Sequence, residues 1–140
     1  MTRPMTLTTC ALVATIGFAA LVAAPSQAAT TPSTTIFRGS FTGTAKYTGS
    51  GTATVVKKGT ARTLKLAGNF KADRRSIRLR MYLATDAGGR TFVDLGPMAE
   101  TGAQSFRIPS KVKLGTYRYA IAWCAAVNEP IARTKLNPVK

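Results

Sequence analysis

The most reactive side chain in the sequence is the thiol of Cys124, which closes the aromatic run TYRYAIAWC at residues 116–124. The chain has no histidine, and its other cysteine, Cys10, lies near the N-terminus. Without histidine there is no Ser-His-Asp or Cys-His catalytic arrangement, no ordinary zinc site and no histidine-ligated haem. A lone thiol is therefore the chemical group on which a function would centre.

The remaining polar residues do not indicate a conventional enzyme. The sequence has no P-loop and no dinucleotide-binding glycine pattern ahead of a helix. A glycosidase needs two carboxylates on either side of the scissile bond, and the acids here are scattered. We therefore predict no metal site and no conventional enzyme activity, and leave a redox or electron-transfer module open. The five acids are Asp73, Asp86, Asp94, Glu100 and Glu129.

The N-terminus reads as an export signal at residues 1–28. Arg3 supplies the positive charge, residues 10–24 are a mostly apolar run of fifteen, and small residues stand at Ser26 and Ala28. The alternative is a membrane anchor, but a spanning helix needs ~20 residues. We expect cleavage after Ala28, with loss of Cys10, and a secreted or cell-surface protein outside the cytoplasmic membrane.

The 112 residues that follow the signal are enough for one domain. A Thr/Pro/Ser-rich tether is expected at residues 29–35 and the domain at residues 36–140. A single cysteine in an oxidising compartment is buried and inert, free and reactive, or joined to another molecule, for example in a disulfide-linked dimer through Cys124. The sequence leaves these three fates open.

Short segments with period-2 alternation, separated by glycine-rich turns, predict the elements that hold Cys124. No segment shows a sustained helical stripe. The pattern predicts an all-β fold: a single antiparallel β sandwich, jelly-roll-like or barrel-like. The expected strands are residues 36–41, 52–58, 60–68, 77–84, 90–96, 104–109 and 116–124, with a turn at Gly49-Ser50-Gly51.

Alternation along residues 117–124 places Trp123 and Cys124 on opposite faces of a strand. Because large aromatic side chains dominate core energetics, we expect the face with Trp123 to be the core. Cys124 would then point to the opposite surface. There Arg118, and Arg133 from the final segment, would favour the thiolate.

Net charge is the second constraint on function. Once Arg3 is removed with the signal, 19 basic residues face five acidic ones, a formal charge of +14. This favours anionic partners such as a cell-surface polymer or membrane headgroups. The densest basic cluster alternates with apolar residues and has no interleaved aromatics, which is typical of a solvated strand face and not of a specific nucleic-acid site. It consists of Lys71, Arg74, Arg75, Arg78 and Arg80.

The segments GSGTATVV, LRMYLAT, TFVDLGPM, GAQSFRIPSKV and YAIAWC, in this order, closely resemble the DM13 family. Members are small extracytoplasmic β domains that also occur joined to DOMON and cytochrome b561-like modules. The resemblance covers about residues 36–136.

The resemblance implies a redox-linked function with a redox partner protein. It also implies that Cys124 acts as a bare thiol or as a ligand to a prosthetic group such as haem. Family members often have histidine where this chain has Tyr47. The absence of histidine disfavours haem, since the other axial candidates are Met81, Met98, tyrosines and lysines. Two hypotheses follow: a thiol-based electron-transfer domain centred on Cys124, or a cationic cell-surface or wall-polymer binding module with a structural cysteine.

Overall fold

The computed structural model describes residues 31–73 and 78–140. Within these residues the prediction of an all-β fold is confirmed, because ten strands form one antiparallel sheet and no helix is present. No helix in the described ranges has the length and apolar character that crossing a membrane would require. The expected signal at residues 1–28 lies outside the described residues, as do Arg74 and Arg75 of the basic cluster.

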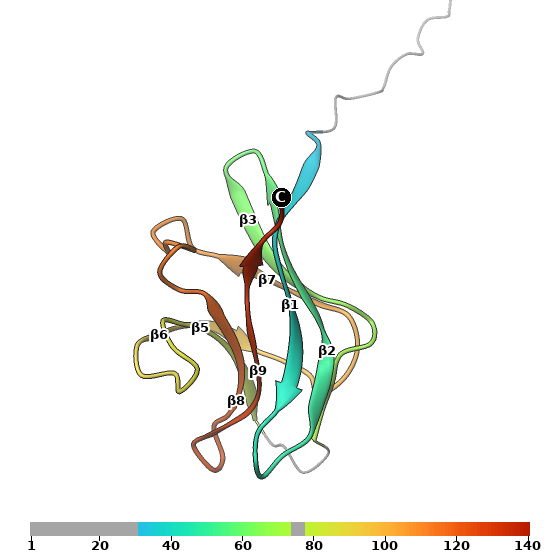
Figure 1. Ribbon diagram of the computed structural model, residues 1–140, viewed down its shortest axis with the longest axis vertical. Coiled ribbons are helices and arrows are strands. Elements are labelled where there is room, and N and C mark those ends of the chain that lie inside the picture. Colours follow the sequence, from blue (N-terminus) through green and yellow to red (C-terminus); the bar gives the residue numbers. More distant parts are fainter. Residues whose placement is uncertain (1–30, 74–77) are drawn as a thin grey trace, which may run out of the picture. The chain divides into compact units, whose positions relative to one another are not determined.

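The sheet curls into a nearly closed barrel (Figure 1). Its strand order is β6-β5-β8-β9-β1-β2-β3-β7, and the two edge strands β6 and β7 come into contact. Two short strands lie off this path, since β10 pairs with β1 and β4 with β2. The strands are β1 (Ser33–Gly43), β2 (Gly49–Lys58), β3 (Ala61–Leu66), β4 (Lys71–Ala72), β5 (Leu79–Ala84), β6 (Phe92–Pro97), β7 (Gln104–Ile108), β8 (Tyr119–Cys124), β9 (Glu129–Lys135) and β10 (Asn137–Pro138).

The first strand begins inside the expected tether. β1 starts at Ser33, three residues before the predicted start at Ile36, and Ser33 pairs with Lys58 at the far end of β2. The β-branched residues Thr34 and Thr35 suit an extended, paired backbone. The ordered domain therefore includes the last residues of the segment read as a tether.

The predicted turn at Gly49-Ser50-Gly51 is wrong. These residues open β2, and the reversal between β1 and β2 lies at residues 44–48. A Cβ atom on Gly49 would lie 2.5 Å from the Cβ of Ala132, and one on Gly51 would lie 2.5 Å from the Cα of Phe70. Gly51 also has a φ of +126°, which L side chains rarely adopt. These glycines permit close packing across the barrel and do not mark a turn.

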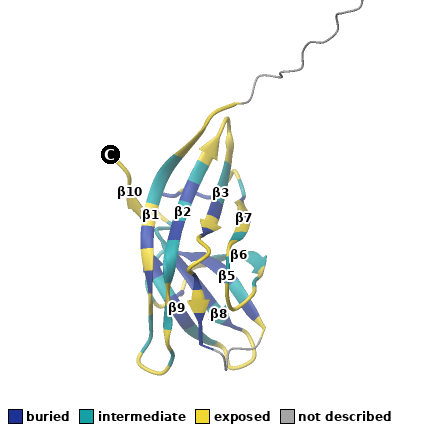
Figure 2. Cartoon of the chain, turned by 90° about the vertical axis from the view of Figure 1, so that its right-hand side faces the viewer, coloured by how far each residue is buried: buried dark blue, intermediate teal, exposed yellow. Residues whose placement is uncertain are grey.

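Apolar side chains of every long strand except β6 fill the inside of the barrel. The hairpin tips are mostly exposed, as the yellow colouring in Figure 2 shows. The expected alternation in β3 is confirmed, with Leu64 and Leu66 buried on either side of exposed Lys65. In β5, Leu79, Met81 and Leu83 are buried in the same cluster. This interior fixes which face of each neighbouring strand is turned inward.

The faces of β8 are reversed relative to the sequence prediction. Ala122 and Cys124 belong to the interior cluster, whereas Ile121 and the partly buried Trp123 pack in a second, smaller cluster with Tyr82 on the outer face. A narrow barrel interior alternates small and large side chains. Since β5 and other strands already supply large ones, β8 contributes its small residues inward and its aromatic residues outward.

Candidate functional site

Cys124 lies at the end of β8 with its side chain inside the barrel. It is only 2% exposed. In the sheet it stands between Leu79 of β5 and Glu129 of β9. Immediately after it, the amide of Ala125 donates a hydrogen bond to the carbonyl oxygen of Arg78 at 3.1 Å. The thiol is therefore held at one end of the barrel by paired strands on both sides.

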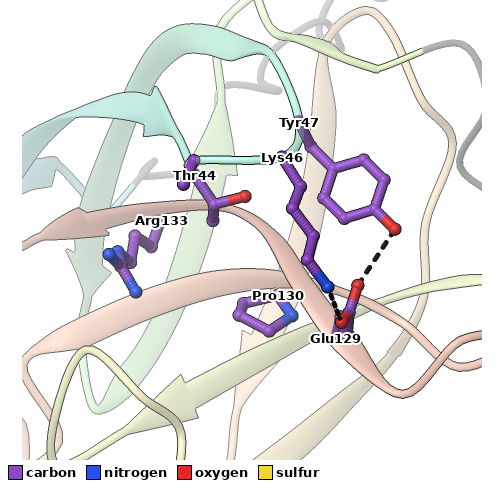
Figure 3. Close-up of a pocket in the computed structure, with 7 residues that line it drawn as sticks. Thr44, Lys46, Tyr47, Glu129, Pro130 and Arg133 are labelled. Atoms are coloured by element: carbon purple, nitrogen blue, oxygen red, sulfur yellow. Dashed lines mark hydrogen bonds and ion pairs between the residues drawn. The ribbon is translucent and has the colours of Figure 1, made fainter.

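The loop between β1 and β2 contacts this end of the barrel, at the same end as the β8–β9 loop (Figures 1 and 3). The hydroxyl of Tyr47 donates to Oε2 of Glu129 at 3.0 Å, and Nζ of Lys46 donates to Oε1 at 2.6 Å. Tyr47 is partly buried against the interior cluster that contains Cys124. One carboxylate thus anchors a tyrosine that packs on the same core as the thiol.

The charges of these groups are coupled. The hydrogen bond from Lys46, followed by the one from Tyr47, holds the pKa of Glu129 below its ordinary value of 4.5. The hydrogen bond to Glu129 is also the main reason why the pKa of Tyr47 is raised, with burial second and a small contribution from a charge on Cys124. At neutral pH the cluster holds an ionised carboxylate and a neutral tyrosine.

A second carboxylate holds the loop from another side. Asp73 follows β4 and is buried, with 7% of its surface exposed. Its Oδ2 accepts a hydrogen bond from the amide of Thr48 at 3.3 Å. The position of Tyr47 is therefore determined on two sides, by Glu129 through its hydroxyl and by Asp73 through the next residue.

A hollow of about 280 Å³ opens beside this cluster (Figure 3). Solvent in the hollow can reach Tyr47 and Glu129. Cys124 does not line the hollow, so its thiol is not in contact with that solvent. Its lining residues are Thr44, Ala45, Lys46, Tyr47, Glu129, Pro130 and Arg133.

The expectation that two arginines flank the thiol is wrong. Arg118 precedes β8 at the opposite end from Cys124, about 20 Å away along a strand, and its Nε donates to the carbonyl of Leu136 at 3.4 Å. Arg133 pairs with Ile121, whose side chain packs outside the barrel, and its Nη1 donates to the carbonyl of Ala87. Because Cys124 faces inward, cations on the outer face do not reach it.

In the basic cluster, Arg80 has the solvated position that alternation predicts. Its Nε lies 2.6 Å from Oδ2 of Asp94, and both side chains are about one-third exposed. Arg78 is exposed and has a positive φ of 56° just before β5 begins. Neither arginine contributes charge to the inside of the barrel.

A thiolate-bound haem does not fit these residues. Cys124 and Met81 are packed in the apolar interior, and Met98 packs against the same cluster. A planar macrocycle on the sulfur would have to displace that core. Among the described residues, no three His, Cys, Asp or Glu side chains gather as a metal site would require.

A family model described as electron transfer DM13 matches residues 40–136, most of the described domain. The chain belongs to the DM13 family. No curated protein and no solved structure matches it. The matched region contains Cys124, Tyr47 and Glu129, so the cluster at the end of the barrel is part of the DM13 domain.

Cys124 and Tyr47 stand out in the sequence, whereas Glu129 and Asp73 are there only two of five scattered acids. A signal for Glu129 was present, because Asn128, which has a φ of 57°, is a turn residue between two strand-like segments. A hairpin at that position places Glu129 opposite Cys124. No local signal links Asp73 to Thr48, which is 25 residues away in the chain.

Proposed function

We propose that the protein is an exported electron-transfer domain in which Cys124 is the redox group. The observation that carries this proposal is the position of Cys124 inside the barrel end, across the ladder from Glu129 and against the core on which Tyr47 packs. Membership of the electron-transfer DM13 family supports the class of function. The export signal read from residues 1–28 supports the location.

Burial of the sulfur favours electron exchange over thiol–disulfide exchange. Disulfide exchange requires direct attack between sulfur atoms, and a thiol that is 2% exposed is not accessible to a second protein. An electron can cross a few ångströms of protein without such contact. In the proposed step the thiol loses one electron to a one-electron acceptor in a partner protein and one proton toward the Tyr47–Glu129 pair, and the reverse step restores the thiol.

Tyr47 and Glu129 supply a proton exit in this scheme. The phenol accepts the proton of the thiol while its own proton moves along the existing hydrogen bond to Oε2 of Glu129. Glu129 lines the solvent-filled hollow and passes the proton to water. The carboxylate is ionised at neutral pH and can therefore take the proton, and the pKa lowered by Lys46 and Tyr47 favours its release to water.

Protein-film voltammetry of the processed protein tests the redox group. A one-electron, one-proton couple shifts by about 59 mV per pH unit. We expect such a response in the parent protein and its loss in Cys124→Ser, with circular dichroism confirming that the variant is folded. Tyr47→Phe keeps the ring but removes the hydroxyl, and should slow the proton-coupled exchange, seen as a wider separation of the anodic and cathodic peaks at high scan rate, while the pH slope of the midpoint stays the same. A response that survives in Cys124→Ser would overturn the proposal.

The processing part of the proposal has a separate test. N-terminal mass spectrometry of exported protein should find Ala29 as the first residue, because small residues stand at Ser26 and Ala28. A membrane-retained species that still carries Cys10 would contradict it.

A further inference from the structure

The geometry points to a second site, unrelated to the thiol, in the outer hollow between β1 and the β9–β10 segment. This hollow binds one phosphate group of an anionic phosphodiester polymer. The rest of the polymer continues across the outer face of β1, β2 and β3. We propose that the domain is held on such a polymer outside the membrane. The site lies apart from the basic cluster of Arg78 and Arg80 singled out in the sequence, and it does not depend on the redox proposal.

The hollow measures about 560 Å³ and lies where β1 and β9 separate. Arg38 and Lys135, both exposed, stand on its two sides. Gly39 lies at its base, where an added Cβ would collide with Oγ1 of Thr134. Cations on two sides, with the exposed hydroxyl-bearing residue Ser40 in the lining, form the donor set that a phosphate oxygen prefers.

Among the residues that the structure describes, no ion pair with an acidic side chain neutralises these cations. Neither β1, β2, β3 nor β7 contains an aspartate or glutamate. Within the described ranges two acids pair with cations away from this face, Asp94 with Arg80 and Glu129 with Lys46. Asp73 accepts a hydrogen bond from the amide of Thr48. Asp86 accepts hydrogen bonds within its own turn. The positive field of this face is therefore available to an external anion.

The positive charge continues from the hollow across the sheet. Arg38 is the ladder partner of Thr54, Thr54 of Lys65, and Lys65 of Ser105. Their neighbours Val55 and Leu64 are buried inside the barrel, so alternation turns this row outward. Neighbouring strands are ~4.8 Å apart, which places the backbones at Arg38 and Lys65 about 10 Å apart. A single phosphate cannot use cations spread over this distance, but a chain of them can.

The occupant is therefore an extended polymer and not a small anion. Each exposed contact between a cation and a phosphate is weak and screened by salt. When several phosphates belong to one polymer, the first contact raises the effective concentration of the others, so the overall affinity exceeds that of any single contact. The row of Thr and Ser between the cations adds hydroxyl donors. Of the large apolar side chains that are exposed in the described residues, only Val139 borders the hollow. This composition favours a hydrated polymer over a membrane surface.

Binding of the processed protein to soluble poly(glycerol phosphate), measured by calorimetry at low and high salt, tests the proposal. The site variant carries Arg38→Gln, Lys65→Gln and Lys135→Gln. The matched control carries Arg78→Gln, Arg90→Gln and Lys111→Gln, all exposed and away from the row. Both variants lose three positive charges, and circular dichroism confirms their fold.

We expect the site variant to lose at least about tenfold in affinity and the control less than about threefold, because only the former loses phosphate contacts and their released counterions. Glycerol phosphate monomer should bind far more weakly than the polymer. Equal losses in the two variants would reduce the effect to net charge and overturn the assignment of the site. Binding to anionic phosphatidylglycerol vesicles without binding to the polymer would overturn the choice of partner.

Discussion

The two halves of the sheet differ in how many of their faces are buried. In β1, β2, β3 and β7, one face packs in the barrel and the other is polar and cationic. In β5 and β8, the inner face joins the main core and the outer face carries a second apolar cluster. Alternation of apolar and polar residues therefore identifies the inner face only in the first half.

The outer cluster is an aromatic stack. The rings of Tyr82 and Phe92 lie 4.1 Å apart at 11°, and those of Tyr82 and Trp123 lie 5.5 Å apart at 21°. Trp123 also donates from Nε1 to Oδ1 of Asn128 at 3.3 Å. Large aromatic side chains can thus lie on the outer face of a sheet when they shield one another from water. The size of a side chain alone therefore does not show that it belongs to the core.

The largest expected effect is at the interior that both halves share. Met81→Ala should lower the free energy of unfolding by about 2 to 5 kcal/mol, because Met81 is fully buried and its loss leaves a cavity. Leu64→Ala, in the other half of the sheet, should lower the free energy of unfolding by a similar amount. Urea denaturation measures both. A large effect for one residue and none for the other would mean that the two halves do not share one core.

A smaller loss is expected on the outer face of the second half. Trp123→Ala should cost about 1 to 3 kcal/mol, since the ring is only partly buried but stacks on Tyr82. Trp123→Phe, which keeps a ring, is the matched control and should recover part of the loss. A cost as large as that of Met81→Ala in thermal or urea unfolding would place Trp123 in the core after all.

The outer face of the first half should tolerate substitution. Lys65→Ala should change the free energy of unfolding by no more than about 0.5 kcal/mol, because Lys65 is exposed and has no acidic partner among the described residues. Urea midpoints of the variant and the parent should nearly coincide. A marked destabilisation would reveal a structural role for this cationic face.

The smallest effect concerns the ion pair between the β1–β2 loop and β9. The folded pKa of Glu129 lies below its ordinary 4.5, so its stabilising contribution is present above pH 4.5 and is lost as pH falls through the folded pKa. Melting temperatures of Glu129→Gln and the parent should differ slightly at pH 7 and converge in acid. A difference that persists at pH 3 would contradict an electrostatic origin.

Much of the fold was predictable from local pattern, because a strand with one polar face shows alternating polar and apolar residues in the sequence. β3, with Lys65 between two buried leucines, is such a case. β8 is not, because its small residues Ala120 and Ala122 alternate with Tyr119, Ile121 and Trp123, so that neither face is clearly polar. Which side of β8 faces inward depends on the volume that Met81 and Leu83 already occupy, and that volume is a tertiary property.

The site shows the same limit. Cys124 could be identified because a lone thiol in a histidine-free chain is chemically conspicuous. Its surroundings could not, because Tyr47 and Glu129 are 82 residues apart and meet only when β1 pairs with β9. The inward orientation of Cys124 also removed the expected role of Arg133, which lies on the other side of the sheet.

The burial of Cys124 also affects how molecules of this protein can become linked. A sulfur that is 2% exposed cannot meet the sulfur of a second molecule while the barrel is intact. Covalent dimers through Cys124 therefore form only from molecules that have opened, and the linkage then prevents them from refolding as they were. On a non-reducing gel, the intensity of the dimer band therefore increases with how often the barrel has opened. Destabilised variants such as Met81→Ala should form the dimer fastest during storage in air.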